Sequence, residues 1–184
     1  MGPIVLGNSL IGVKESYNLN MQLTRAADYA VRVMIHLAGL PPETRASRAE
    51  LAIAAECPEQ FLSKVLQNLT RSGLVVSHRG NTGGFQLPNL HRTASLLQVV
   101  EAIEGPMRLN VCLATDPSCS QVTWCPAHDV WVAAQEAMVA TLRAASISSL
   151  AQQAARRRNG LVSAPKWTSP EAIPAEAAMV RPPG

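Results

Sequence analysis

Apolar residues recur along much of this chain at the three-and-four spacing of amphipathic helices. The helical spacing predicts helices over about 25–40, 48–55, 58–72 and 94–104. A long apolar helix is predicted further on, from 127 to about 145, with a last turn or two within 146–153. The fold is therefore expected to be mostly α.

Residues that cap helices support the first two of these boundaries. Thr24 is placed to cap the N-terminus of the first helix, and the prolines at 41–42 end it. Ser47 and Glu50 have the spacing of a capping box, in which each side chain bonds the backbone of the other residue. The second helix is therefore expected to begin directly after Ser47.

The third predicted helix has one apolar and one polar side. Pro58 suits its first position and Gly73 suits the position just after its end. The polar side carries amides and cations without an acid, and such groups pair with base edges and phosphates. A merely solvated helix face is the alternative. The apolar side comprises Phe61, Leu62, Val65, Leu66 and Leu69, and the polar side comprises Gln60, Ser63, Lys64, Gln67, Asn68 and Arg71.

A β-hairpin is expected after the third helix. Residues 74–79 and 85–88 favour short strands, and the glycine-rich stretch between them favours a turn. The order of helix, short helix, long helix and hairpin is that of a winged helix-turn-helix. These glycines do not follow a nucleotide-binding pattern, because no helix begins after them and no Lys-Ser/Thr follows.

The remaining helices suggest how the chain is organised. Thr93 is the expected cap of the fourth helix, and Pro126 opens the long one. A helix that is apolar almost all round needs cover from two directions, so it is predicted to pack against a second copy of itself. The expected divisions are an N-terminal extension (1–20), a DNA-binding domain (21–105), a cysteine segment (106–125), a dimerisation region (126–158) and a disordered tail (159–184).

Composition adds a charge argument and a compartment. The formal net charge of the 184 residues is +3, and this excess lies within 21–92, where it would attract a polyanion. No apolar run is long enough to span a membrane, and the first residues lack the features of a signal peptide. The expected location is the cytoplasm, where thiols stay reduced.

Three cysteines lie close together in the cysteine segment, at Cys112, Cys119 and Cys125. Thiolates bind zinc, copper(I) and iron–sulfur clusters. Structural zinc sites usually contain closely spaced cysteine pairs, which this segment lacks, so the wider spacing favours an iron–sulfur cluster over zinc, thiol redox chemistry or simple packing. Cys57 stands apart at a turn and is interpreted as a packing residue. No arrangement of catalytic residues is apparent, so an enzyme is not expected.

Four collinear motifs together resemble the Rrf-two family of bacterial winged-helix regulators. They are residues 21–32 (MQLTRAADYAVR), residues 79–85 (RGNTGGF), residues 99–105 (VVEAIEG) and the three cysteines. The resemblance covers about residues 21–155 and implies a homodimeric transcription factor. It also implies an iron–sulfur cluster, with a [2Fe–2S] or [4Fe–4S] core, on the three cysteines.

Within this resemblance the fourth ligand stays open between His128 and Asp28, because different members of the family use equivalents of each. The loop between Cys112 and Cys119 is slightly longer than in members that use the histidine, which leaves the type of cluster and the signal open.

The sequence therefore predicts a repressor that binds a near-palindromic operator in double-stranded DNA as a homodimer, with its affinity set by a cluster that senses iron, redox state or nitric oxide. The alternative is a cluster-free regulator that uses its thiols as a redox switch or senses nothing. The expected DNA-binding residues are Arg48, Gln60, Ser63, Lys64, Gln67, Asn68 and Arg71, together with Arg79, Gly80, Asn81, Gly83 and Gly84 in the wing.

Overall fold

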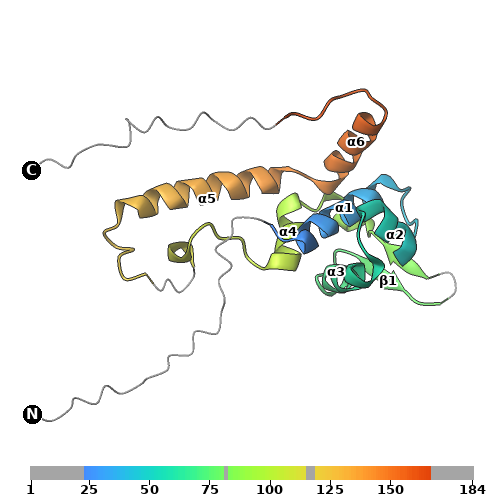
Figure 1. The fold of residues 1–184 in the computed structure, drawn as a ribbon, viewed down its shortest axis with the longest axis horizontal. Helices are drawn as coiled ribbons and strands as arrows, with labels where there is room; N and C mark the ends of the chain where they lie inside the picture. Colours follow the sequence, from blue (N-terminus) through green and yellow to red (C-terminus); the bar gives the residue numbers. More distant parts are fainter. Residues whose placement is uncertain (1–22, 81–82, 115–118, 167–184) are drawn as a thin grey trace, which may run out of the picture.

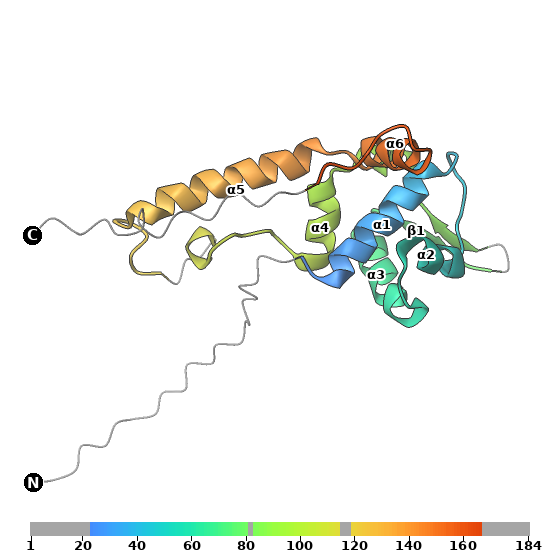
Figure 2. The ribbon, with the colours of Figure 1, turned by 45° about the horizontal axis from the view of Figure 1, so that its top comes forward.

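The computed structural model describes residues 23–80, 83–114 and 119–166 (Figure 1). The N-terminal extension, Asn81 and the tail from residue 167 onwards lie outside these described residues. In chain order the elements are α1 (Arg25–Gly39), α2 (Arg48–Ala55), α3 (Glu59–Arg71), β1 (Val76–His78), β2 (Gly84–Gln86), η1 (Asn89–Thr93), α4 (Leu96–Glu104), η2 (Val111–Leu113), α5 (Pro126–Ala144) and α6 (Ile147–Arg158). Helices α1 to α4, α6 and the hairpin form one body, from which α5 extends (Figure 2).

The predicted caps of the first two helices are confirmed. The hydroxyl of Thr24 accepts a hydrogen bond from the backbone N–H of Ala27 at the start of α1. Ser47 and Glu50 form the complete capping box at the start of α2. Helix α3 begins one residue later than predicted, because Pro58 has extended backbone angles and caps the helix instead of entering it.

The core lies where α1, α2, α3, α4 and α6 meet. On α3 the predicted apolar residues Leu62, Val65, Leu66 and Leu69 are all buried, but Phe61 is 47% exposed. The ring of Phe61 packs edge-on against Tyr29 of α1, with 5.9 Å between the ring centroids. Phe61 therefore belongs to the rim of the helix and not to the core.

The predicted hairpin is present and shorter than expected. Strands β1 and β2 pair antiparallel, with Val76 opposite Gln86. The hairpin is joined to the chain before α2 because Ala46 and Phe85 exchange backbone hydrogen bonds of 2.9 and 2.8 Å. This connection fixes the hairpin next to the chain that leads into α2.

Helix α4 begins at Leu96, not at Ala94, and its cap is Ser95 instead of Thr93. Residues 89–93 form a 3₁₀ turn after Pro88, and Ala94 is extended, so Thr93 cannot open an α-helix. Ser95 and Gln98 form a second capping box, with a bond of 2.8 Å from the Ser95 N–H to Gln98 Oε1.

The last two helices lie in different surroundings. Helix α5 has the predicted bounds to within a residue, and none of its residues is buried in the single chain. Helix α6 is longer than the predicted short turn and packs against α1, with Ile147 fully buried. Backbone bonds of 2.8 Å from Leu96 N to Ala145 O and from Ile147 N to Ala94 O join the start of α6 to the start of α4.

Within the described part of the chain, no helix is both long and apolar enough to cross a membrane.

Candidate nucleic-acid interface and cysteine segment

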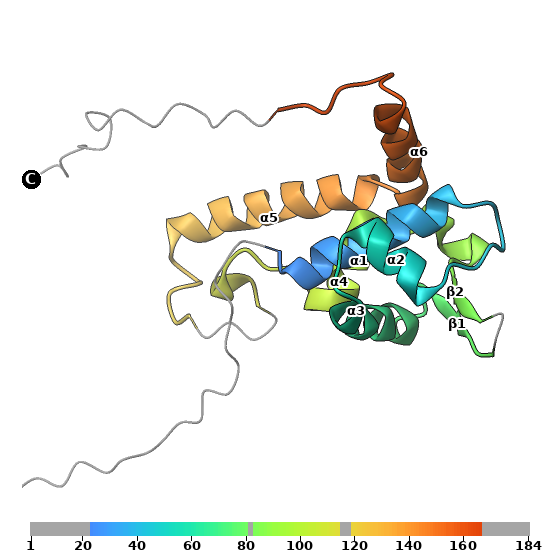
Figure 3. The ribbon, with the colours of Figure 1, turned by 45° about the vertical axis from the view of Figure 1, so that its right-hand side comes forward.

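The outer face of α3 presents most of the predicted DNA-contacting side chains to solvent. Gln60, Ser63, Lys64, Gln67 and Arg71 are exposed, and Asn68 is half-buried. The hydroxyl of Ser63 donates to the carbonyl oxygen of Glu59, 3.2 Å away, so its hydrogen is already engaged. Helix α3, which carries these amides and cations, lies beside the β1–β2 hairpin (Figure 3).

One acid lies beside this face, at the start of the helix. Glu59 is in the first turn of α3, where the helix dipole stabilises a carboxylate. Its Oε1 lies 3.4 Å from Nε of Arg48 on α2. Arg48 therefore pairs with Glu59 in the absence of DNA, and any phosphate must compete with that carboxylate.

The wing combines exposed residues with glycines that the backbone requires. Arg79 and Gly80 are exposed, which suits contact with DNA. A Cβ on Gly84 would lie 2.7 Å from the carbonyl oxygen of Ala46, and the φ angle of Gly84 is +151°. A Cβ on Gly83 would collide with the carbonyl oxygen of His78. Gly83 and Gly84 thus have a structural role whether or not they touch DNA.

The three clustered cysteines are half-buried free thiols. Cys112 lies in the η2 turn, and Cys125 caps the N-terminus of α5. Cys57 is buried in the core as interpreted from the sequence, and burial raises the pKa of its thiol. Among residues 23–80, 83–114 and 119–166 there is no cluster of three His, Cys, Asp or Glu side chains placed to hold a metal ion.

Gln135 of α5 connects the start of the cysteine segment to the long helix. Its Nε2 donates to the carbonyl oxygen of Met107 at 2.7 Å, and its Oε1 accepts from the N–H of Leu109 at 2.9 Å. The sequence offered a signal for this role, since Gln135 is one of few polar residues within an apolar helix. Its partners could not be found that way, because they lie 26 and 28 residues away in the chain.

The two candidates for a fourth cluster ligand have different surroundings. His128 lies in the first turn of α5, and its Nδ1 is buried without a hydrogen-bond partner among the described residues. Asp28 in the first turn of α1 is ion-paired with Arg32, with 2.9 Å between Oδ2 and Nη2. Thiols together with an unpartnered imidazole nitrogen are donors that suit an iron–sulfur group.

Arg32 links Asp28 to the turn between α2 and α3. Its Nη1 lies 2.9 Å from Oε2 of Glu56 and 3.4 Å from the carbonyl oxygen of Ala55. Glu56 caps the C-terminus of α2 in the left-handed conformation, with φ of +53°. Arg32 therefore connects the candidate ligand Asp28 on α1 to Glu56, in the turn that leads into α3, through two ion pairs. The sequence pattern gave no indication of this connection.

The chain is similar to a known protein family and to two transcriptional regulators. Residues 23–153 match the family model described as Rrf2, an iron-dependent transcriptional regulator. The chain is 33% identical over 133 residues to the putative HTH-type transcriptional regulator Rv1287 of Mycobacterium tuberculosis, covering 71% of this chain and 81% of that one. It is 30% identical over 131 residues to the HTH-type transcriptional regulator NsrR of Geobacillus kaustophilus, covering 71% and 88%.

Solved structures agree on the fold. CymR, the global cysteine regulator of B. subtilis, superposes with a TM-score of 0.59 at 21% identity, covering 72% of this chain and 98% of that one. IscR of T. potens superposes with a TM-score of 0.58 at 20% identity, covering 74% and 90%. The fold is a winged helix-turn-helix, and the relatives are regulators and not enzymes. The chain belongs to the Rrf2 family of DNA-binding transcriptional regulators.

Proposed function

We propose that this chain is a homodimeric repressor that binds a near-palindromic operator, with an affinity set by an iron–sulfur cluster. The observation that carries the DNA-binding part is the exposure of amides and cations on α3, a helix that lies beside the wing. Gln60, Gln67 and Arg71 suit base edges in the major groove, and Lys64 suits a phosphate. The wing, with Arg79, suits the flanking backbone or the minor groove.

Dimerisation through α5 is supported by the exposure of this helix in the single chain. No residue of the helix is buried, and Val130 is 66% exposed. A second copy related by a twofold axis would cover the same face on both chains. Two equal copies of α3 would then face two half-sites of related sequence, which is why the operator should be near-palindromic. A dimer bound over a promoter would exclude RNA polymerase and so repress.

The residues that would hold the cluster are Cys112, Cys119 and Cys125, with His128 or Asp28 as fourth ligand. When bound, the cluster would supply sensitivity to oxidation, to iron loss or to nitric oxide. The thiols are free and half-buried, and Nδ1 of His128 has no partner among the described residues, which supports this donor set. Members of this family have been described collectively as iron-dependent, in agreement with the proposal.

The chain's own contacts suggest how the cysteine segment would influence DNA binding. Gln135 holds residues 107–109 against α5, and the N–H of Met107 lies 3.4 Å from Oε1 of Glu101 on α4. Any rearrangement of the cysteine segment would therefore change its hydrogen bonds to the dimerisation helix α5 and to α4 of the DNA-binding body. A coupling of about 1–3 kcal/mol would change DNA affinity roughly 5- to 150-fold.

Anaerobic purification tests the cluster. We expect a coloured protein with visible absorption, bound iron and acid-labile sulfide, and we expect Cys112→Ala to abolish all three. Cys57→Ala is the matched control, because that thiol lies in the core and should leave the colour unchanged. A colourless wild-type protein without iron would contradict the proposal.

Selection from a random DNA library tests the operator. The enriched site should have twofold symmetry, and Lys64→Ala should weaken binding to selected and random duplexes alike. Gln67→Ala should instead reduce the preference for particular bases. Arg156→Ala on α6 is an exposed-cation control. If Lys64→Ala and Gln67→Ala lost equal affinity on both duplexes, this division of roles would be wrong.

A cluster-free regulator that uses cysteine thiols as a redox switch is the second candidate. It is favoured by the absence, among the described residues, of three donors gathered around one point. In that case the reduced and oxidised forms of a colourless protein should differ in DNA affinity, and Cys112→Ser should remove the difference. The iron analysis above separates the two candidates.

A further inference from the structure

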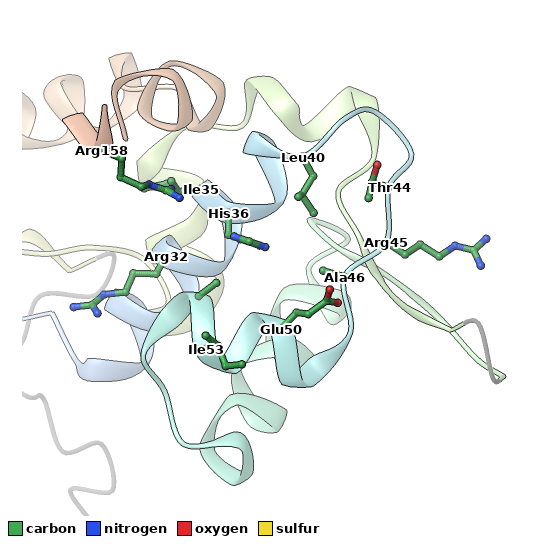
Figure 4. A pocket seen from close by; sticks show the side chains of 11 residues that line it. Arg32, Ile35, His36, Leu40, Thr44, Arg45, Ala46, Glu50, Ile53 and Arg158 are labelled. Atoms are coloured by element: carbon green, nitrogen blue, oxygen red, sulfur yellow. The ribbon is translucent and has the colours of Figure 1, made fainter. Parts of the chain in front are cut away.

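A cavity of about 700 Å³ lies on the body, outside the α3 face and outside the cysteine segment (Figure 4). Its walls are α1, the connection between α1 and α2, α2 itself and the end of α6. Small-molecule sites in proteins typically measure about 300–1,000 Å³. The cavity is therefore large enough for a small organic molecule and too small for a folded partner.

Part of the wall is apolar and uncovered. Ile53 of α2 is 80% exposed, and Ala54 next to it also lines the cavity. Ile35 and Leu40, from α1 and just beyond it, form the facing wall. An exposed isoleucine on a short helix remains in contact with water unless an apolar group covers it, and covering it is favourable. This wall suits the apolar part of a ligand.

The other part of the wall is positively charged. Arg158 extends from the end of α6 past Ile35 towards His36 (Figure 4) and forms no ion pair with any described residue. Burial, and then the positive charge of Arg158, lower the pKa of His36, while Glu50 opposes this shift. The carboxylate of Glu50 already accepts the N–H of Ser47 at 2.6 Å in the capping box. Three arginines, Arg32, Arg45 and Arg158, line the cavity against this one carboxylate, so the net charge of the lining is positive.

We propose that this cavity binds a small organic anion with an apolar body, of the class of medium-chain carboxylates. The anionic group would bind Arg158, with the imidazole of His36 as a hydrogen-bond partner, and the hydrocarbon would lie on Ile35, Leu40 and Ile53. An arginine can hold a carboxylate through two parallel hydrogen bonds, which gives the site its preference for this group. Because Ile53 and Ala54 belong to α2, which packs against α3, the bound anion would contact the helix-turn-helix directly.

Calorimetric titration of the full chain with octanoate, and with octanol as an uncharged analogue of the same length, tests the proposal. Octanoate should bind the wild type more tightly than octanol. Arg158→Gln should weaken octanoate by at least about tenfold and leave octanol unchanged, since it removes a charge-assisted hydrogen bond. Arg157→Gln is the matched control, because it removes the same charge from the same helix outside the cavity lining.

A second variant tests the apolar wall without disturbing the core. Ile53→Asn should weaken octanoate and octanol alike, and circular dichroism should be unchanged because this side chain is exposed. The proposal is overturned if octanoate shows no saturable binding up to millimolar concentration, or if Arg158→Gln and Arg157→Gln bind it equally. It is also overturned if Ile53→Asn lowers the sedimenting mass, because a second copy would then cover the cavity.

Discussion

Replacing Gln135 by leucine should loosen the start of the cysteine segment while leaving the helices intact. The amide of Gln135 is the donor to Met107 O at 2.7 Å and the acceptor from Leu109 N at 2.9 Å, and leucine keeps its size without either bond. Both backbone groups are partly buried, so water would satisfy them only when the segment opens.

The magnitude follows from the two lost hydrogen bonds. Each contributes about 0.5–1.5 kcal/mol net, so together they stabilise the closed segment by about 1–3 kcal/mol. Since about 1.4 kcal/mol corresponds to a factor of ten, the open population should rise roughly 5- to 150-fold. The free energy of unfolding of the whole chain should fall by no more than the same amount.

The rate at which Cys112 reacts with a thiol reagent measures this opening. The cluster-free protein with Cys119 and Cys125 replaced by serine leaves Cys112 as the reactive thiol, because Cys57 is buried. Gln135→Leu should raise the rate roughly 5- to 150-fold, and Glu136→Gln at the exposed neighbouring position should not change it. Equal rates in the two variants would refute the role of Gln135.

Three further predictions concern stability. Ile147→Ala should lower the free energy of unfolding in urea by about 2–5 kcal/mol, because it leaves a cavity between α6 and α1; a loss below about 1 kcal/mol would mean that α6 is not part of the core. Gly84→Ala should destabilise the chain more than Gly73→Ala, since both have positive φ but only at Gly84 would the new Cβ meet backbone, and equal losses by thermal unfolding would contradict this. The lowered pKa of His36 means that the unfolded chain binds the proton more readily, so stability should fall as the pH drops through about 6.5, and His36→Gln should reduce that slope in urea titrations at several pH values.

Local signals in the sequence were sufficient for the elements whose ends are determined locally. Thr24 and the Ser47–Glu50 box set the starts of α1 and α2 through contacts within three residues, and such contacts are visible in a sequence. The start of α4 was misplaced because Thr93 and Ser95 are both good caps. Gln98 decides between them, and its side chain completes the box with Ser95 only.

Contacts between distant residues explain what the sequence did not reveal. Phe61 has the spacing of a core residue, yet it is half-exposed and its ring packs against the half-buried ring of Tyr29 at the edge of the core. Glu59 could not be recognised as the partner of Arg48 until α2 and α3 were placed side by side. The residues that could donate to a cluster can be recognised from their type in the sequence. Whether they come together depends on the path of the cysteine segment and on a second chain.

The packing of α6 against α1 has consequences for expression and truncation of the protein. Ile147 completes a core that begins with α1. The cysteine segment and α5 are therefore inserted, in sequence, between two parts of one folding unit. During synthesis, α1 would have no permanent cover on that side until the ribosome had released residues beyond 151. A fragment ending after α4 should therefore be prone to aggregation. Fusions are better attached after Arg158, where the chain has left the core.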